Sequence, residues 1–142
     1  MGSSMRRELV IESDMSELDR VRAEVREFIK DLFDAINLNR VVLSVDEALA
    51  NIIEHAYPPE SKETISLIME RKPDRVVFEL RDEGPPFDPT HLGKPDLDSL
   101  GRNTADGGLG VFLYTTLMEA SYRRDPSEAN VLTLVRRLES AA

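Results

Sequence analysis

The chain has 142 residues, 41% of them hydrophobic and 32% charged, and a formal net charge of −9. These totals predict one folded domain with its own core, and they argue against a nucleic-acid-binding protein, whose affinity would rest on clustered Lys and Arg. The absence of cysteine excludes disulfides and thiolate chemistry, and no apolar run approaches the ~18 residues of a membrane span, so we expect a cytoplasmic protein without a membrane segment.

The apolar pattern predicts strands and helices around one long connection. Residues 1–5 are expected to be a non-native remnant or a disordered start. Asp14 and Glu17 have the spacing of a capping box and begin the first helix, which Asn37 and Asn39 should separate from the second. In chain order, the predicted elements are a strand at 6–12, helices at 14–35 and 40–56, strands at 64–70 and 75–81, a helix at 111–120, and strands at 121–124 and 130–138.

This order of elements predicts an α/β (α+β) two-layer sandwich, in which a mixed, mainly antiparallel sheet carries the helices on one face. Residues 6–142 would form this single domain. The connection over residues 82–110 contains six of the seven glycines and four of the eight prolines. A connection of this length without clear periodicity usually has a function, and we expect a mobile lid at about 88–106.

A polar stripe on the second predicted helix is the first candidate for chemistry. Glu47, Asn51 and Glu54 are spaced by four and then three residues, so they share one face of the helix, with His55 at its edge. The side-chain oxygen of Asn51 could ligate Mg²⁺, and Glu47 could accept a proton from an attacking hydroxyl. By spacing alone, a solvated helix face is the simpler explanation.

Two further motifs point to a nucleotide. The Asp82 carboxylate follows an apolar strand and could accept a hydrogen bond from the adenine amino group, while Gly84 would let the backbone approach a flat ring. The run Gly107–Gly110 precedes a helix, where backbone N–H groups can point at phosphate. A proline-containing turn and a plain loop-to-helix junction are the alternatives. Because the chain is acidic, its affinity for an anion must come from a divalent cation and backbone N–H groups.

In this order and spacing, the motifs resemble the nucleotide site of the GHKL ATPase and kinase superfamily, with its Bergerat-type ATP-binding fold. Glu47-x-x-x-Asn51 matches the N-box, Asp82-x-Gly84 the first glycine box and Gly108-x-Gly110 the second. The closest resemblance is to the anti-sigma factor serine/threonine kinases of bacterial partner switching. Its further marks, which extend over essentially the whole chain, are Asp46-Glu47-Ala48, His55-Ala56-Tyr57-Pro58, residues 82–89, Gly107–Gly110 and Leu132-Thr133-Leu134.

The resemblance implies a role for each matching residue. Asn51 would ligate a magnesium ion that bridges the ATP phosphates, and Glu47 would be the catalytic base. Asp82 would recognise adenine, with Thr133 supporting it through water and Gly84 shaping the adenine wall. For His55, a nucleotide contact and a capping or packing role both stay open. The nucleotide-binding set is completed by Phe87, Gly107, Gly108, Leu109 and Gly110.

The resemblance leaves two functions to distinguish. The first is an ATP- and Mg²⁺-dependent serine/threonine protein kinase that phosphorylates a STAS-type antagonist and alternately binds a sigma factor or another target. The second is a binding module in which nucleotide gates partner capture, with little or no phosphoryl transfer. Glu47 separates them, since a pure binder needs no carboxylate beside Asn51. The resemblance also implies a possible homodimer. An α/β domain that binds no nucleotide is the third alternative.

Overall fold

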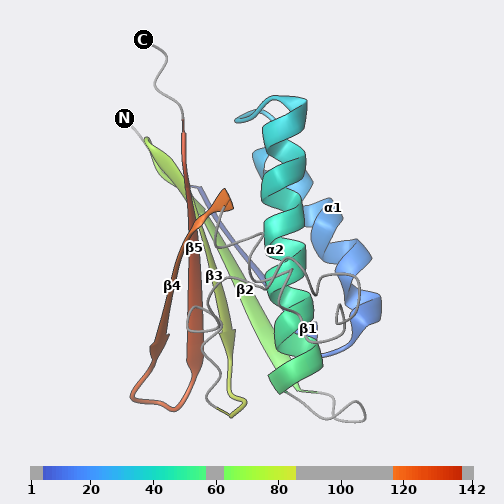
Figure 1. Ribbon diagram of the computed structural model, residues 1–142, viewed down its shortest axis with the longest axis vertical. Coiled ribbons are helices and arrows are strands. Elements are labelled where there is room, and N and C mark those ends of the chain that lie inside the picture. The colour runs from blue at the N-terminus through green and yellow to red at the C-terminus, as the bar shows by residue number, and fades with distance from the viewer. Residues whose placement is uncertain (1–4, 57–62, 86–116, 139–142) are drawn as a thin grey trace, which may run out of the picture.

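The computed structural model describes residues 5–56, 63–85 and 117–138. Its strands form one sheet, and its two helices lie across one face of that sheet (Figure 1). The elements are strand β1 (Met5–Glu12), the 3₁₀ turn η1 (Met15–Glu17), helices α1 (Leu18–Ile29) and α2 (Ala35–Ala56), and strands β2 (Thr64–Arg71), β3 (Arg75–Asp82), β4 (Glu119–Arg124) and β5 (Asn130–Arg137).

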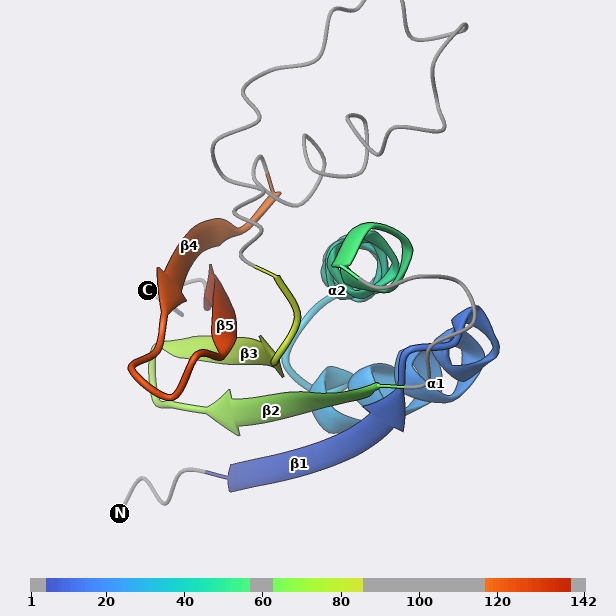
Figure 2. The ribbon, with the colours of Figure 1, turned by 90° about the horizontal axis from the view of Figure 1, so that it is seen from below.

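The sheet has five strands in the order β1-β2-β3-β5-β4. All four pairings between these strands are antiparallel. Strand β5 therefore lies between β3 and β4, and its register places Asn130 opposite Asp82 of β3. The end view in Figure 2 shows α1 and α2 on the same side of the sheet. The predicted two-layer α+β fold with a mainly antiparallel sheet is confirmed.

The core lies between the sheet and the two helices. Along β3, Val76, Phe78 and Leu80 are fully buried, and the residues between them are only partly covered. This period of two puts one face of each strand against the helices, and full burial of such a side chain contributes about 1.5–3 kcal/mol. The helices supply the other half of the core through Leu18, Val21, Val25, Phe28 and Ile29 of α1 and Val41, Val42, Val45, Ala48, Leu49, Ile52 and Ile53 of α2.

The two helices meet at a different point from the one predicted. Helix α1 ends at Ile29 rather than Ala35, and α2 begins at Ala35 rather than Arg40. The cause is Asp34, whose carboxylate accepts a hydrogen bond from the backbone N–H of Asn37 at 2.8 Å. An aspartate in this position caps a helix, so α2 starts directly after it.

The predicted separation of the helices by Asn37 and Asn39 is therefore wrong. Both lie in the first turns of α2, and their side chains bond to neighbouring elements. The Asn37 oxygen accepts from Arg136 of β5 at 2.8 Å, and the Asn39 oxygen accepts from Arg26 of α1 at 3.0 Å. Their polar groups thus do not compete with the helix backbone. Within the described ranges, neither helix is long and apolar enough to cross a membrane.

The start of β4 also differs from the prediction. The predicted helix extends to Ala120, but Glu119 and Ala120 belong to β4 and pair with Val135 and Leu134 of β5. The strand pairing with β5 decides the conformation of these two residues. The earlier part of that predicted helix, residues 111–116, lies outside the described residues.

Candidate functional site

Two parts of the predicted pocket lie at the same end of the molecule. The second half of α2 carries Asn51, and the last residue of β3 is Asp82. In Figure 1 the carboxyl end of α2 and the carboxyl end of β3 both lie at the bottom, and Figure 2 looks at them from that side. The fold therefore gathers the helix stripe and the strand-end turn at one end of the two-layer domain.

Asn51 is buried, with only 4% of its surface exposed. Its side-chain Nδ2 has no hydrogen-bond partner, and it is alone in this among the buried side-chain polar atoms of the described residues. An amide left unsatisfied in the interior costs about 1–3 kcal/mol. Such a group in a native protein calls for an explanation, for example a water, an ion or a ligand that completes its hydrogen bonding. A solvated helix face does not explain Asn51.

Glu47 lies one helical turn before Asn51 and is half-buried. Burial raises the pKa of its carboxyl, and the neighbouring carboxylates of Asp46 and Glu54 raise it further. Asp46 is itself held by Arg22 of α1, whose guanidinium lies 2.7 Å from the Asp46 carboxylate. A carboxylate with a raised pKa is a stronger proton acceptor once it is ionised. The surroundings of Glu47 therefore suit a general base.

The other predicted residues of the helix and the loops are less informative. Glu54 is exposed, so solvation explains its polar character. His55 lies in the last turn of α2, but its side chain lies outside the described part of the chain. Phe87, the lid at 88–106 and Gly107–Gly110 also lie outside the described residues, so their roles stay predictions. In the described ranges, no group of three or more His, Cys, Asp or Glu side chains is placed to hold a metal ion.

Asp82 is buried at the end of β3, with 4% exposed. Its Oδ1 accepts hydrogen bonds from the backbone N–H of Gly84 at 2.9 Å and from Nδ2 of Asn130 at 3.1 Å. The Gly84 carbonyl accepts from Arg124 of β4 at 2.9 Å. The Asp-x-Gly turn is thus an Asx turn whose carboxylate and backbone are both fixed by neighbouring strands.

The sheet register corrects the predicted support of Asp82 by Thr133. Thr133 pairs with Glu79, three residues before Asp82, whereas the partner of Asp82 is Asn130. Side chains alternate between the two faces of a strand, so Thr133 lies on the opposite face from Asn130 and Asp82. The side chain on β5 that contacts Asp82 is Asn130, which the sequence reasoning missed.

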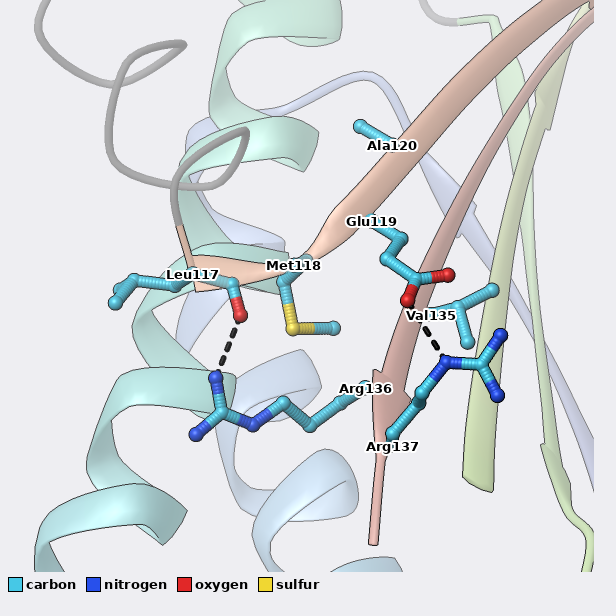
Figure 3. A pocket seen from close by; sticks show the side chains of 7 residues that line it. All are labelled: Leu117, Met118, Glu119, Ala120, Val135, Arg136 and Arg137. Atoms are coloured by element: carbon cyan, nitrogen blue, oxygen red, sulfur yellow. Dashed lines mark hydrogen bonds and ion pairs between the residues drawn. The ribbon is translucent and has the colours of Figure 1, made fainter. Parts of the chain in front are cut away.

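A hollow lies at the opposite end of the sheet from Asp82, between the start of β4 and the end of β5. It has a volume of about 510 Å³ and is shown in Figure 3. Arg136 donates to the Leu117 carbonyl at 2.6 Å, and Nε of Arg137 donates to Glu119 at 2.9 Å. Both guanidinium groups are engaged by the protein, and the hollow contains none of the predicted site residues. It is not the predicted nucleotide site.

Comparison with known proteins agrees with this fold. A family model described as a histidine kinase-like ATPase domain matches residues 11–136. The chain is 32% identical over 97 residues to the serine/threonine-protein kinase BtrW of Bordetella bronchiseptica, and the match covers 68% of each protein. It is 34% identical over 82 residues to the serine-protein kinase RsbW of Staphylococcus epidermidis, with 54% of this chain and 52% of that protein covered.

A solved structure shows the same fold. The crystal structure of the RsbU and RsbW domains of a Mycobacterium tuberculosis protein matches with a TM-score of 0.65 and 18% sequence identity. The match covers 97% of this chain and 34% of that chain. The chain thus spans about half of the Staphylococcus relative and a third of the mycobacterial chain.

Proposed function

The chain belongs to the histidine kinase-like ATPase domain family, which implies that it binds ATP, and we propose that it is an ATP- and Mg²⁺-dependent serine/threonine protein kinase. Its proposed substrate is a hydroxyl side chain on a STAS-type antagonist in a cytoplasmic partner-switching system. It would also sequester a sigma factor or another target, with a homodimer as its possible form. The names of the relatives, both kinases at 32% and 34% identity, support the reaction class.

The single observation that carries the proposal is the unsatisfied amide of Asn51. This side chain is 4% exposed and its Nδ2 lacks a partner, so the folded protein keeps a polar group in its interior at a cost. An amide oxygen is a suitable ligand for Mg²⁺, and the amide nitrogen can donate to a phosphate oxygen or to water. Mg²⁺ bound there would neutralise phosphate charge next to an acidic protein.

Glu47 is the proposed base. In the proposed reaction the hydroxyl oxygen of the substrate forms a bond to the γ-phosphorus, and the bond from that phosphorus to the β,γ-bridging oxygen breaks. The hydroxyl proton passes to the Glu47 carboxylate, and ADP leaves. The raised pKa of Glu47, caused by burial and by Asp46 and Glu54, strengthens it as an acceptor of that proton.

Asp82 is the proposed adenine-binding residue. Its buried carboxylate has one oxygen oriented by Gly84 and Asn130, which gives a fixed acceptor for an amino group. Gly84 carries no side chain, so a flat ring could approach the backbone at this turn. The proposed nucleotide site is completed by His55, whose side chain lies outside the described part of the chain, and by residues outside the described ranges, namely Phe87, Gly107, Gly108, Leu109 and Gly110.

A nucleotide-gated binding module is the alternative function, and one observation favours the kinase over it. Nucleotide binding alone gives no reason to keep a partly buried carboxylate beside two other carboxylates, an arrangement that raises the pKa of Glu47. Strained electrostatics of this kind cluster at catalytic sites.

The proposal is tested by incubating the chain with γ-labelled ATP, Mg²⁺ and a STAS-type antagonist that carries an acceptor serine. We expect label on the antagonist and none on a variant whose acceptor serine is alanine. Glu47→Gln should lower transfer about 10²- to 10⁴-fold while ATP binding persists. Glu27→Gln is the control, because this carboxylate is exposed on α1 and is not among the groups that shift the pKa of Glu47. ATP binding without transfer by the wild type would support the binding module instead.

A further inference from the structure

The side chain of Asn130 in β5 forms hydrogen bonds with the end of β3 and with β4. Its Nδ2 donates to the Asp82 carboxylate at 3.1 Å, to the Gly84 carbonyl at 3.2 Å and to the Pro85 carbonyl at 2.9 Å. The side chain is 4% exposed, so these bonds form in an interior environment. The amide nitrogen thus holds both the carboxylate and the backbone that follow β3.

The other end of the same amide is held by β4. The Asn130 oxygen accepts from the hydroxyl of Tyr122 and from the Arg124 guanidinium, the latter at 3.0 Å. The same Arg124 nitrogen also donates to the Gly84 carbonyl at 2.9 Å. Arg124 therefore joins Asn130 to the turn after β3 through two hydrogen bonds.

These contacts allow only one orientation of the Asn130 amide. A flipped amide would place its oxygen against the oxygens of Asp82, Gly84 and Pro85, and its nitrogen against the Arg124 guanidinium, which can only donate. Since an amide has one donating and one accepting end, the flip would lose the bonds to Asp82, Gly84, Pro85 and Arg124, and only the Tyr122 hydroxyl could adapt to it. The donor end of Asn130 is locked toward Asp82.

We propose that Asn130, locked by Arg124, is the positioning residue that makes the site select a 6-amino purine over a 6-oxo purine. The inference rests on the proposed function, in which Asp82 binds the base. The Asp82 carboxylate, held in place by two donors, would act toward the ligand as a hydrogen-bond acceptor. The adenine 6-amino group can donate to such a carboxylate, whereas the guanine 6-oxo group would face it with like charge.

A purely structural role for Asn130 makes a different prediction. If Asn130 only joined the strands, its loss would weaken every ligand of the site to the same extent. If it positions Asp82, its loss should weaken recognition of the base and leave recognition of the phosphates unchanged. Tripolyphosphate, which has the phosphates of ATP but no base, separates the two roles.

The experiment measures the dissociation constants of Mg-ATP, Mg-GTP and Mg-tripolyphosphate for the full chain by calorimetry. The variants are Asn130→Ala and Arg124→Met. Arg123→Met is the matched control, because Arg123 is the adjacent arginine of β4 and lies near Glu79 and Asp125 at 3.9 Å, away from the Asn130 amide. Arg124→Met leaves Asn130 in place and decides the question if Asn130→Ala fails to fold.

We expect Asn130→Ala to weaken Mg-ATP about tenfold or more and to lower the preference for ATP over GTP by a similar factor, with Mg-tripolyphosphate within about twofold of wild type. Arg124→Met should shift the preference in the same direction, and Arg123→Met should not. An unchanged preference in both test variants, or equal losses for ATP and tripolyphosphate, would overturn the inference alone. A wild type that binds no ATP would overturn the proposed function and this inference with it.

Discussion

Replacing Asn51 by leucine should make the protein more stable and unable to bind Mg-ATP. Leucine repeats the branching of asparagine at Cγ but has no polar atom. Because Asn51 is 4% exposed and its Nδ2 has no partner, the substitution removes a desolvation cost of about 1–3 kcal/mol. For a chain of this length, 1 kcal/mol corresponds to about 3 °C in Tm. The expected gain is therefore about 3–9 °C.

The assay is thermal unfolding with and without Mg-ATP. At a ligand concentration 100 times Kd, the wild type should gain about 2.7 kcal/mol, or roughly 8 °C. Asn51→Leu should show the same Tm with and without the nucleotide. The variant should therefore have the higher Tm without ligand, and addition of Mg-ATP should remove most or all of that difference.

Ser44→Ala is the matched control on the same helix. Ser44 is fully buried, but its hydroxyl donates to the Arg40 carbonyl at 2.8 Å, so its hydrogen bonding is satisfied. Its removal should lower the free energy of unfolding by about 0.5–1.5 kcal/mol and leave nucleotide binding intact. A destabilised Asn51→Leu, or one that Mg-ATP still stabilises, would refute the idea that Asn51 is kept for a ligand.

Three further outcomes follow from the same structure. Glu47→Gln should lower the rate of phosphoryl transfer about 10²- to 10⁴-fold with the Kd of Mg-ATP unchanged, as measured by labelled transfer and calorimetry; wild-type rates in the variant would exclude Glu47 as the base. The raised pKa of Glu47 means that its ionisation costs stability as pH rises from the unfolded pKa through the folded one. Urea unfolding should therefore find Glu47→Gln more stable than wild type at pH 7, with the gap shrinking below pH ~4; a gap that does not change with pH would contradict this. Leu67→Ala should lose about 2–5 kcal/mol, because Leu67 is fully buried between sheet and helices, whereas Leu43→Ala, at a side chain 41% exposed, should stay within about 0.5 kcal/mol of wild type.

The parts of the fold that repeat along the chain could be predicted from the sequence. Apolar residues alternate along β2 and β3 and recur at helical spacing along α1 and α2. These patterns indicate which face of each element meets the core, so the two layers and most element ranges could be predicted. Helix ends depend on single capping contacts instead. Asp34 begins α2 because its carboxylate accepts a hydrogen bond from the backbone N–H of Asn37, whereas the prediction placed the break at Asn37 and Asn39.

The site was predictable where its residues lie close in sequence and not where the sheet register joins them. Asn51 and Asp82 stand in local motifs, but the contact between Asp82 and Asn130 spans 48 residues. The sequence contained one signal. Asn130 lies on the same face of β5 as Leu132 and Leu134, which are buried, so a polar side chain at that position requires a hydrogen-bond partner. The opposite face of β5 carries Val131 and Val135, which are also apolar. The strand pattern therefore did not show whether Asn130 or Thr133 lies on the face of Asp82.

The strand order has a consequence for how the domain is made. Strand β5 completes the sheet between β3 and β4, yet it is the last of the five to be synthesised. At about 5–20 residues per second, the 48 residues between Asp82 and Asn130 take roughly 2–10 s to emerge. During that time the nascent chain carries β3 with an open edge, which is a hazard for misassociation on the ribosome. The Asp82 carboxylate, which would bind the base, is fixed only at the end of this interval. Nucleotide would therefore bind and stabilise the completed domain and not its precursor.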